Sequence, residues 1–244
     1  MRKENIIAFI PASGLGQRLW PITQFIPKEM FPIGNKPLIH YLVENIAASG
    51  IHEIVIGIRP VKHTIKDYLK DGRAFGVRIK YTAGSPIGID QTIRQAERYL
   101  KRGPFLLAVA DLFITDPTMF KEILRLYHEH RVSIDVLVKD AKKNFPSFAT
   151  AIGKKIGRRL WEIQSYANRT RYTKNPLASI GISVLTPEFL RYLPRPNQKS
   201  ETQLANSVND YMKSKRRLGY ETSVRVFDCS TTSGFIEANR YILK

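Results

Sequence analysis

The first half of the chain alternates short apolar runs with segments whose apolar residues recur every three or four positions. Such short runs are typical of buried strands, and the longer spacing is typical of helices with one buried face. Over this half the pattern predicts strands at 5–10, 53–58, 77–82, 105–110 and 134–138, and helices at 37–49, 62–70, 92–101 and 117–130. Their alternation indicates βα units and a largely parallel sheet.

The second half is richer in extended segments. It predicts strands at 148–152, 159–165, 178–185 and 222–227, and helices at 187–193, 201–215 and 234–243. No repeat is visible, and no stretch has the Gly/Ser content of a flexible linker. We therefore expect one domain over residues 1–244.

Composition narrows the class of protein. The 244 residues include 39 Lys+Arg and 21 Asp+Glu, a net charge of +18, and 43% of the residues are hydrophobic, as in a globular protein. This excess of positive charge indicates an anionic partner, which leaves nucleic acid, a membrane surface and a small phosphorylated substrate open. A lone Cys229 excludes an internal disulfide and a cysteine-based zinc cluster. The apolar run 6–12 is broken by Pro11 and is too short to cross a bilayer, so we expect a cytoplasmic protein without a membrane partner.

The densest chemistry follows the first predicted strand. Gly14 and Gly16 would let backbone N–H groups approach an anion at the carboxyl end of that strand. Arg18 and Lys28 add permanent positive charge within a loop stiffened by prolines. No Gly-Lys-Ser/Thr follows, and Leu19 stands where a dinucleotide loop has its third glycine, which excludes the two commonest phosphate loops. Alone, the Gly-x-Gly pair is equally compatible with a tight turn.

The wider motif resembles the sugar-1-phosphate nucleotidyltransferases, and most of all the bacterial UTP–glucose-1-phosphate uridylyltransferases. The resemblance rests on the loop Pro11-Ala-Ser-Gly-Leu-Gly-Gln-Arg-Leu-Trp-Pro-Ile-Thr23, on Pro27-Lys-Glu-Met30 and on Lys36-Pro37. It implies a Rossmann-like, three-layer α/β/α fold of GT-A type with a mixed, largely parallel central sheet. It also implies a nucleotide-binding half over about 1–115 and a sugar-binding half over about 116–244.

The resemblance extends to metal and substrate residues. Asp111, directly after the apolar run 105–110, and Asp228, in Phe227-Asp-Cys-Ser230, match the aspartates that hold Mg²⁺ in this family. It implies that Arg18 and Lys28 are catalytic, stabilising the phosphates of an NTP while a sugar-1-phosphate attacks. The implied nucleotide-binding residues are Ala12, Ser13, Gly14, Leu15, Gly16, Gln17, Ala83 and Gly88, and the implied sugar-binding residues are Ala149, Glu162 and Gly181. The sequence is also compatible with a homo-oligomer.

Four positions depart from the family pattern. Gln17 replaces a threonine of the loop, and Ala83 stands where many relatives have a glutamine that reads the base. Ala149 replaces a glycine that lets the sugar approach the backbone. Ile163 follows Glu162 where relatives have a lysine for the sugar phosphate, and Arg169, Arg171 and Lys174 are alternative cations for that role.

These departures keep alternatives open. We expect UTP and glucose-1-phosphate as substrates, with dTTP as the second choice of nucleotide. A catalytically weak relative that binds a nucleotide sugar for regulation or assembly is another interpretation, because Ile163 and Ala149 stand where the family has residues that contact the sugar or its phosphate.

We expect no nucleic-acid partner, because the remaining basic residues, including 213–217, form short scattered groups typical of a solvated surface. His128 and His130 are two positions apart and so point to different faces of the predicted helix, which argues against a metal pair. We expect Trp20 and Trp161 to be packing residues, although Trp161, beside Glu162, is placed to line the sugar pocket.

Overall fold

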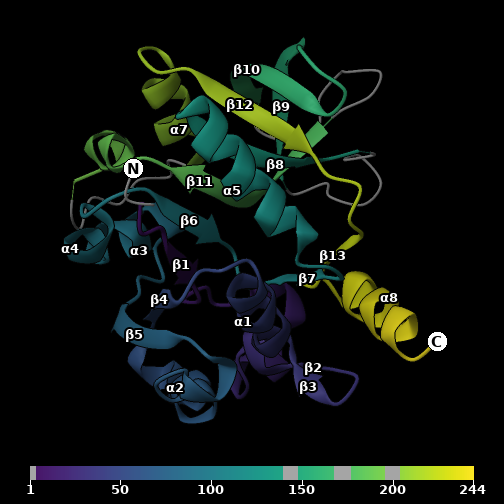
Figure 1. Ribbon diagram of the computed structural model, residues 1–244. Coiled ribbons are helices and arrows are strands. Elements are labelled where there is room, and N and C mark those ends of the chain that lie inside the picture. The colour runs from purple at the N-terminus through teal and green to yellow at the C-terminus, as the bar shows by residue number, and fades with distance from the viewer. Residues whose placement is uncertain (1–3, 140–147, 168–176, 196–203) are drawn as a thin grey trace.

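The alternation of side chains along the first strands builds two cores, one on each side of a sheet. A computed structural model describes residues 4–139, 148–167, 177–195 and 204–244 (Figure 1). Its parallel strands β1 (Ile7–Pro11), β4 (Glu53–Ile58), β5 (Arg78–Ala83) and β6 (Phe105–Ala108) lie in the order β5-β4-β1-β6. Ala8 and Ile10 face one hydrophobic cluster, and Ile7 and Phe9 face another. Both faces are therefore covered, as a parallel sheet requires.

Helices supply the two outer layers. One cluster takes buried residues from α1 (Leu38–Ala48), α2 (His63–Leu69) and α5 (Thr118–His130). The other takes them from α3 (Ile89–Gln95), α4 (Glu97–Leu100), the 3-10 helix η6 (Pro187–Tyr192) and α7 (Leu204–Met212). The arrangement is a three-layer α/β/α fold with a mixed central sheet.

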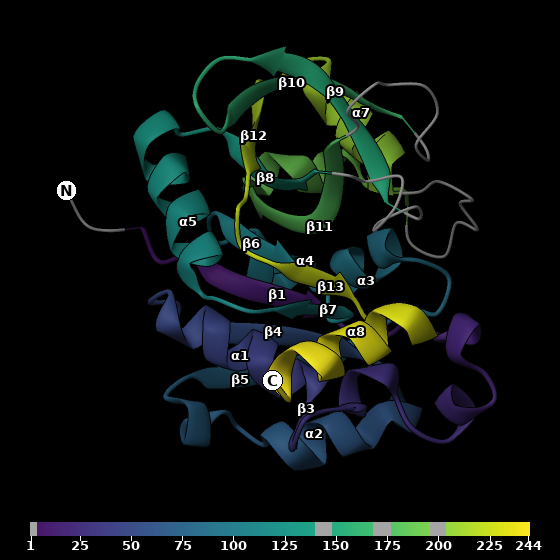
Figure 2. The ribbon, with the colours of Figure 1, turned by 90° about the vertical axis from the view of Figure 1, so that its right-hand side faces the viewer.

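The second half of the chain continues the same sheet and folds it back on itself. Strands β8 (Ser133–Val138), β9 (Ala149–Lys155), β10 (Leu160–Ala167), β11 (Leu177–Leu185) and β12 (Arg217–Glu221) follow β6 in the order β11-β8-β12-β10-β9. Strand β11 pairs with β9 as well as with β6 and β8, so these five strands close into a ring, which forms the upper part of Figure 2. Only β8 and β12 are parallel within it.

Two short pairings complete the fold. Strand β7 (Leu112–Ile114) pairs with β13 (Val226–Asp228), and β2 (Pro32–Ile33) pairs with β3 (Lys36–Pro37). The C-terminal helix α8 (Thr232–Ile242) packs beside β13 and β2 over a small third cluster that includes Cys229 and Ala238 (Figure 2). Within the part of the chain that the structure describes, no helix is long and apolar enough to cross a membrane.

Most predicted elements are confirmed, and the differences have physical causes. The helix predicted at 92–101 starts earlier, after Gly88, and is divided at Ala96 into α3 and α4. Strand β7 was not predicted, because three residues after Asp111 are too few to show a period. Strand β12 was also not predicted, because it begins at Arg217 in a basic run. Trp20 is 52% exposed, so the expectation that it is a packing residue is wrong.

A buried ion pair ties the loop after β1 to the start of α2. Both carboxylate oxygens of Glu29 accept hydrogen bonds from Lys62 Nζ, at 2.9 and 2.8 Å, and both side chains are almost fully buried. Burial lowers the pKa of Lys62, and Glu29 opposes that shift. The pair fixes the segment that carries Lys28.

Removing one partner of this pair should be costly. We expect Lys62→Met to lower the free energy of unfolding by about 3–5 kcal/mol, because Glu29 would remain buried without a cation. The double variant Glu29→Met/Lys62→Met should recover most of that loss, since no isolated charge is left. Urea unfolding measures both, with Lys80→Met, from the more exposed pair with Glu53, as control. Equal stability of the single and double variants would contradict this account.

Gly84 is required where β5 ends against the loop after β1. A Cβ at this position would lie 2.5 Å from Ser13 Cβ and 3.1 Å from the backbone of Gly57. Gly84→Ala should therefore lower stability by about 1–3 kcal/mol, because a hydrogen-bonded Ser13 cannot move aside. Gly103→Ala is the matched control, since its Cβ would meet only Asn5 O at 4.0 Å. Thermal unfolding of the two variants compares them, and a Gly84→Ala midpoint equal to that of the control would refute the steric argument.

Candidate active site

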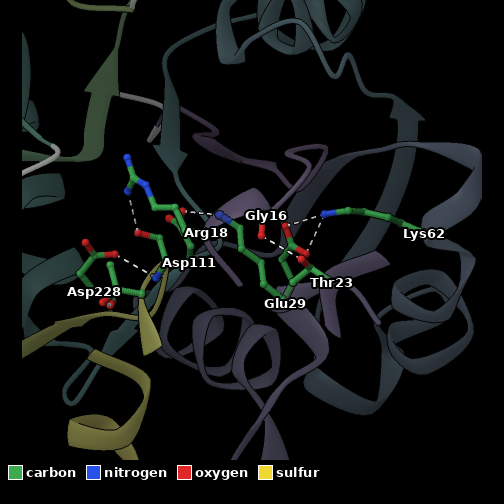
Figure 3. A network of polar contacts seen from close by, with 10 residues as sticks. Gly16, Arg18, Thr23, Glu29, Lys62, Asp111 and Asp228 are labelled. Carbon is green, nitrogen blue, oxygen red and sulfur yellow. Dashed lines mark hydrogen bonds and ion pairs between the residues drawn. The ribbon is translucent and has the colours of Figure 1, made fainter. Parts of the chain in front are cut away.

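The loop after β1 turns sharply at Gly16. This residue has φ of 68°, in the left-handed region that glycine adopts without strain. Its carbonyl oxygen accepts a hydrogen bond of 2.8 Å from Thr23 Oγ1 (Figure 3). The turn leads directly into the 3-10 helix Gln17–Leu19, where Arg18 is exposed and its Nη1 donates to Ser230 Oγ at 3.3 Å.

Hydrogen bonds fix the start of the loop. Ser13 Oγ donates to the backbone oxygen of Ser85 at 2.9 Å and lies 2.7 Å from Thr92 Oγ1. Arg59 Nε donates to the backbone oxygen of Ser13 at 3.0 Å, and the buried Ala12 donates its N–H to Gly57. The loop is thus fixed against β4 and the segment that follows β5.

A cavity of about 180 Å³ opens beside this loop. Among the residues expected from the sequence, Ser13, Gly14, Lys28, Gly88 and Asp111 line it. Ser85, Pro86 and Ile89 also line it, although sequence reasoning did not single them out. The available signal was the Ser-Pro pair that follows β5 after Gly84. Ala12, Leu15, Gly16, Gln17 and Ala83 do not line this cavity, and Ala83 is exposed at the end of β5.

The central contact of the site joins Lys28 and Asp111. Lys28 Nζ lies 2.6 Å from Asp111 Oδ2, and both side chains are largely buried. Burial favours a raised pKa for Asp111, but Lys28, with a smaller effect of Arg18, outweighs it and holds the pKa below its usual value. For Lys28 burial acts to lower the pKa, and Asp111 and Glu29 together raise it instead. Asp111 therefore stays ionised and Lys28 stays protonated at neutral pH.

The pairing of β7 with β13 brings Asp228 to the same place. Asp228 is opposite Leu112 in the register, and the N–H of Cys229 donates to the backbone oxygen of Asp111 at 2.9 Å. Asp228 Oδ1 accepts the N–H of Ser230 at 2.9 Å. Burial raises the pKa of Asp228, and the nearby charge of Asp111 adds to this. Two carboxylates that are far apart in sequence thus lie near each other at the β7–β13 pair.

This pair of carboxylates fits a hard divalent cation in one specific way. The described part of the chain contains no group of three or more His, Cys, Asp or Glu side chains arranged for a metal, and so no complete protein cage there. Mg²⁺ is commonly bound through one or two carboxylates, with substrate phosphates and water completing its shell. Asp111 and Asp228 are two such carboxylates, and they lie beside the loop after β1.

Only some of the residues expected to bind the sugar line one cavity. Ala149 and Gly181 line a second cavity, but Glu162 does not; its Oε1 accepts from Arg216 Nε at 2.6 Å. Ile163 is buried in the core. Trp161 does not line that cavity either, and its Nε1 donates to Glu221 at 3.1 Å. Arg169, Arg171 and Lys174 lie outside the described residues.

One interpretation of a basic run is wrong. The sequence placed residues 213–217 on a solvated surface, yet Arg217 is 2% exposed and forms an ion pair with Asp135. Lys213 and Arg216 of the same run are exposed, as expected. The difference follows from β12, because Arg217 is its first residue and faces inward beside β8.

Known proteins are similar to this chain over most of its length. A UTP–glucose-1-phosphate uridylyltransferase of Pseudomonas aeruginosa is 25% identical over 260 residues, which cover 95% of this chain and 93% of the relative. A putative enzyme of the same name from Bacillus subtilis is 27% identical and covers 82% of this chain and 83% of its own. A crystal structure of a UDP-glucose pyrophosphorylase complexed with UDP-glucose is 27% identical, with a TM-score of 0.88 over 98% of both chains.

A more distant structure shares the fold alone. It is a putative glucose-1-phosphate thymidylyltransferase of Bacillus anthracis, 21% identical, with a TM-score of 0.84 over 97% of this chain and 94% of its own. The family model described as nucleotidyl transferase matches residues 7–244, nearly the whole chain. On this match and the geometry above, the chain belongs to the nucleotidyl transferase family.

Proposed function

We propose that this chain transfers a uridylyl group from UTP to glucose-1-phosphate, forming UDP-glucose and pyrophosphate with Mg²⁺. The observation that carries the proposal is the meeting of Lys28, Asp111 and Asp228 beside a glycine loop at the carboxyl ends of parallel strands. The names of the similar proteins support UTP and glucose-1-phosphate as the substrates.

The proposed reaction requires the protein to align the substrates and to neutralise their charge. An oxygen of the sugar phosphate attacks the α-phosphorus of UTP, and a new P–O bond forms as the bond to the bridging oxygen of the β-phosphate breaks. Pyrophosphate leaves with the electron pair. Because the attacking oxygen is already ionised at neutral pH, no general base is needed. Catalysis then consists of alignment and neutralisation of the phosphate charge.

Lys28 and Arg18 lie at opposite ends of the loop and neutralise different phosphates in this proposal. Lys28, fixed beside Asp111 by the Glu29–Lys62 pair, holds the phosphates at the inner end of the loop. Arg18 lies at the exposed end, toward Ser230, where it stabilises the departing pyrophosphate. Asp111 and Asp228 hold Mg²⁺, which when bound offsets negative charge on the reacting phosphates.

The two halves of the chain divide the substrates in this proposal. Residues of about 1–115 bind the nucleotide around the first cavity, and residues of about 116–244 bind the sugar around the second. The backbone from Ala12 to Gln17 cradles the nucleotide, and Ala83 and Gly88 flank the base. With one buried cysteine, Cys229, the chain suits a reducing compartment, so we place the reaction in the cytoplasm.

Pyrophosphate release tests the proposal directly. Purified protein with Mg²⁺ should release pyrophosphate only when a nucleoside triphosphate and a sugar-1-phosphate are both present, with UTP and glucose-1-phosphate preferred over dTTP and other sugars. Asp111→Asn and Lys28→Met should each lower kcat/KM by about 100-fold, the usual size of the loss when one preorganised charge is removed.

The controls separate chemistry from folding. Asp71→Asn removes an exposed carboxylate on the surface and should leave both activity and thermal midpoint unchanged. No release with any pair from a panel of triphosphates and sugar phosphates would overturn the proposal, as would full activity of Asp111→Asn. Tight binding of a nucleotide sugar without turnover would instead identify a binding protein of the same family.

A further inference from the structure

The ion pair between Lys28 and Asp111 lies in the wall of the first cavity. Both residues line that cavity, and their side chains keep 14% and 21% of their surface exposed. The cavity therefore gives access to the ammonium group and to the carboxylate. In the structure each of these two groups is the partner of the other.

The charges around Asp111 and Asp228 are balanced by the protein itself. The two carboxylates supply at most two negative charges, and Lys28 and Arg18 supply two permanent positive ones. Burial acts to lower the pKa of Lys28, and both carboxylates oppose it, Asp111 more than Asp228. The charge of Arg18 also acts on both carboxylates, which lie with it in the left part of Figure 3. A divalent cation added here alone would therefore bring two positive charges without a counter-charge.

The position of Lys28 hinders a metal ion at the carboxylate of Asp111. Lys28 Nζ lies 2.6 Å from Oδ2, whereas Mg²⁺ binds carboxylate oxygens at about 2.1 Å, so both cations at one oxygen would be within a few Å of each other. At the other oxygen the ion would still meet the ammonium charge, which is screened little in a largely buried pair. The neighbouring Glu29–Lys62 pair holds the segment in place and adds no net charge. Lys28 therefore competes with a metal ion for Asp111.

A nucleotide phosphate in the first cavity would relieve this competition. Its oxygens would offer Lys28 another acceptor and would give the metal further ligands. Within the described ranges, no third His, Cys, Asp or Glu completes a metal site with Asp111 and Asp228. The negative charge of the phosphates would also offset the charge that the metal adds. Metal and nucleotide should each tighten the binding of the other, since such coupling is reciprocal.

We propose that Lys28 acts as a built-in counter-cation, which keeps Mg²⁺ away from Asp111 and Asp228 until a nucleotide brings its phosphates into the first cavity. The inference rests on the proposed function, because it takes Mg²⁺ and a nucleoside triphosphate as the ligands of this site. Lys28 thus has a role besides holding phosphates, since it suppresses metal binding by the protein alone. Removal of its charge should strengthen metal binding although it weakens catalysis.

Metal binding in the absence of nucleotide tests this assignment without requiring turnover. Mn²⁺ serves as the probe, because it takes the same oxygen ligands as Mg²⁺ and loses its free-ion EPR signal when it binds. We expect Lys28→Met to lower the Kd for Mn²⁺ about tenfold relative to wild type, a usual size for an energetic coupling. Excess Mg²⁺ should displace the bound Mn²⁺. Lys80→Met is the matched control, because it frees Glu53 from an ion pair of 2.7 Å outside the site and should leave the Kd unchanged.

Two further variants locate the effect and guard against a change in folding. Lys28→Gln keeps a hydrogen-bond donor beside Asp111 and should show the same tightening as Lys28→Met. Lys28→Met/Asp111→Asn should lose that gain, because the metal's ligand is removed. A Kd for Mn²⁺ at or above the wild-type value in a folded Lys28 single variant overturns the assignment. Retention of the gain in the double variant also overturns it, since the metal would then bind elsewhere.

Failure of the proposed function gives a different result. If wild-type protein releases pyrophosphate from UTP and glucose-1-phosphate while the Lys28 variants gain no affinity for Mn²⁺, only the counter-cation role of Lys28 is wrong. If wild-type protein neither binds UTP with Mn²⁺ nor releases pyrophosphate, the proposed function itself fails, and the role of Lys28 falls with it.

Discussion

The ion pair between Lys28 and Asp111 is the contact on which the geometry of the first cavity depends. A carboxylate buried beside a second carboxylate would favour protonation, and Asp228 shows that tendency in its raised pKa. Lys28 reverses it for Asp111 at a distance of 2.6 Å. Asp111 therefore stays ionised, as a ligand of Mg²⁺ in the proposed function would have to be.

Three tertiary contacts hold the segments around that ion pair. The Glu29–Lys62 pair fixes the segment before β2, and the Ser13–Thr92 contact fixes the glycine loop. The β7–β13 ladder then carries Asp228 back to Asp111 from the C-terminal part of the chain. The first two contacts lie within the first half of the chain, and the third joins the two halves, so Asp228 reaches Asp111 only when both halves are in place.

The sequence predicts those features that depend on local pattern. The strand 53–58 is predicted with its observed bounds, because the run Ile54–Ile58 is flanked by the charged residues Glu53 and Arg59. Gly14, Lys28 and Asp111 were placed near one another by the motif and by the rule that ligands gather at carboxyl ends of strands. Arg217 was missed for the converse reason. A basic residue in a basic run is normally solvated, and its partner Asp135 lies 82 positions away, where no local signal connects them.

The same contrast explains how the departures from the family pattern fit together. Glu162 keeps the residue type of the family motif, but it pairs with Arg216 away from the second cavity, and the neighbouring Ile163 is part of the core. The polar groups at that cavity come instead from the inward faces of β8, β10, β11 and β12. A ring of strands directs every second side chain inward, which is why four strands contribute polar side chains to one cavity. In the proposed function, a sugar in that cavity would meet these inward-facing side chains, whereas the nucleotide would meet the loop whose motif is visible in the sequence.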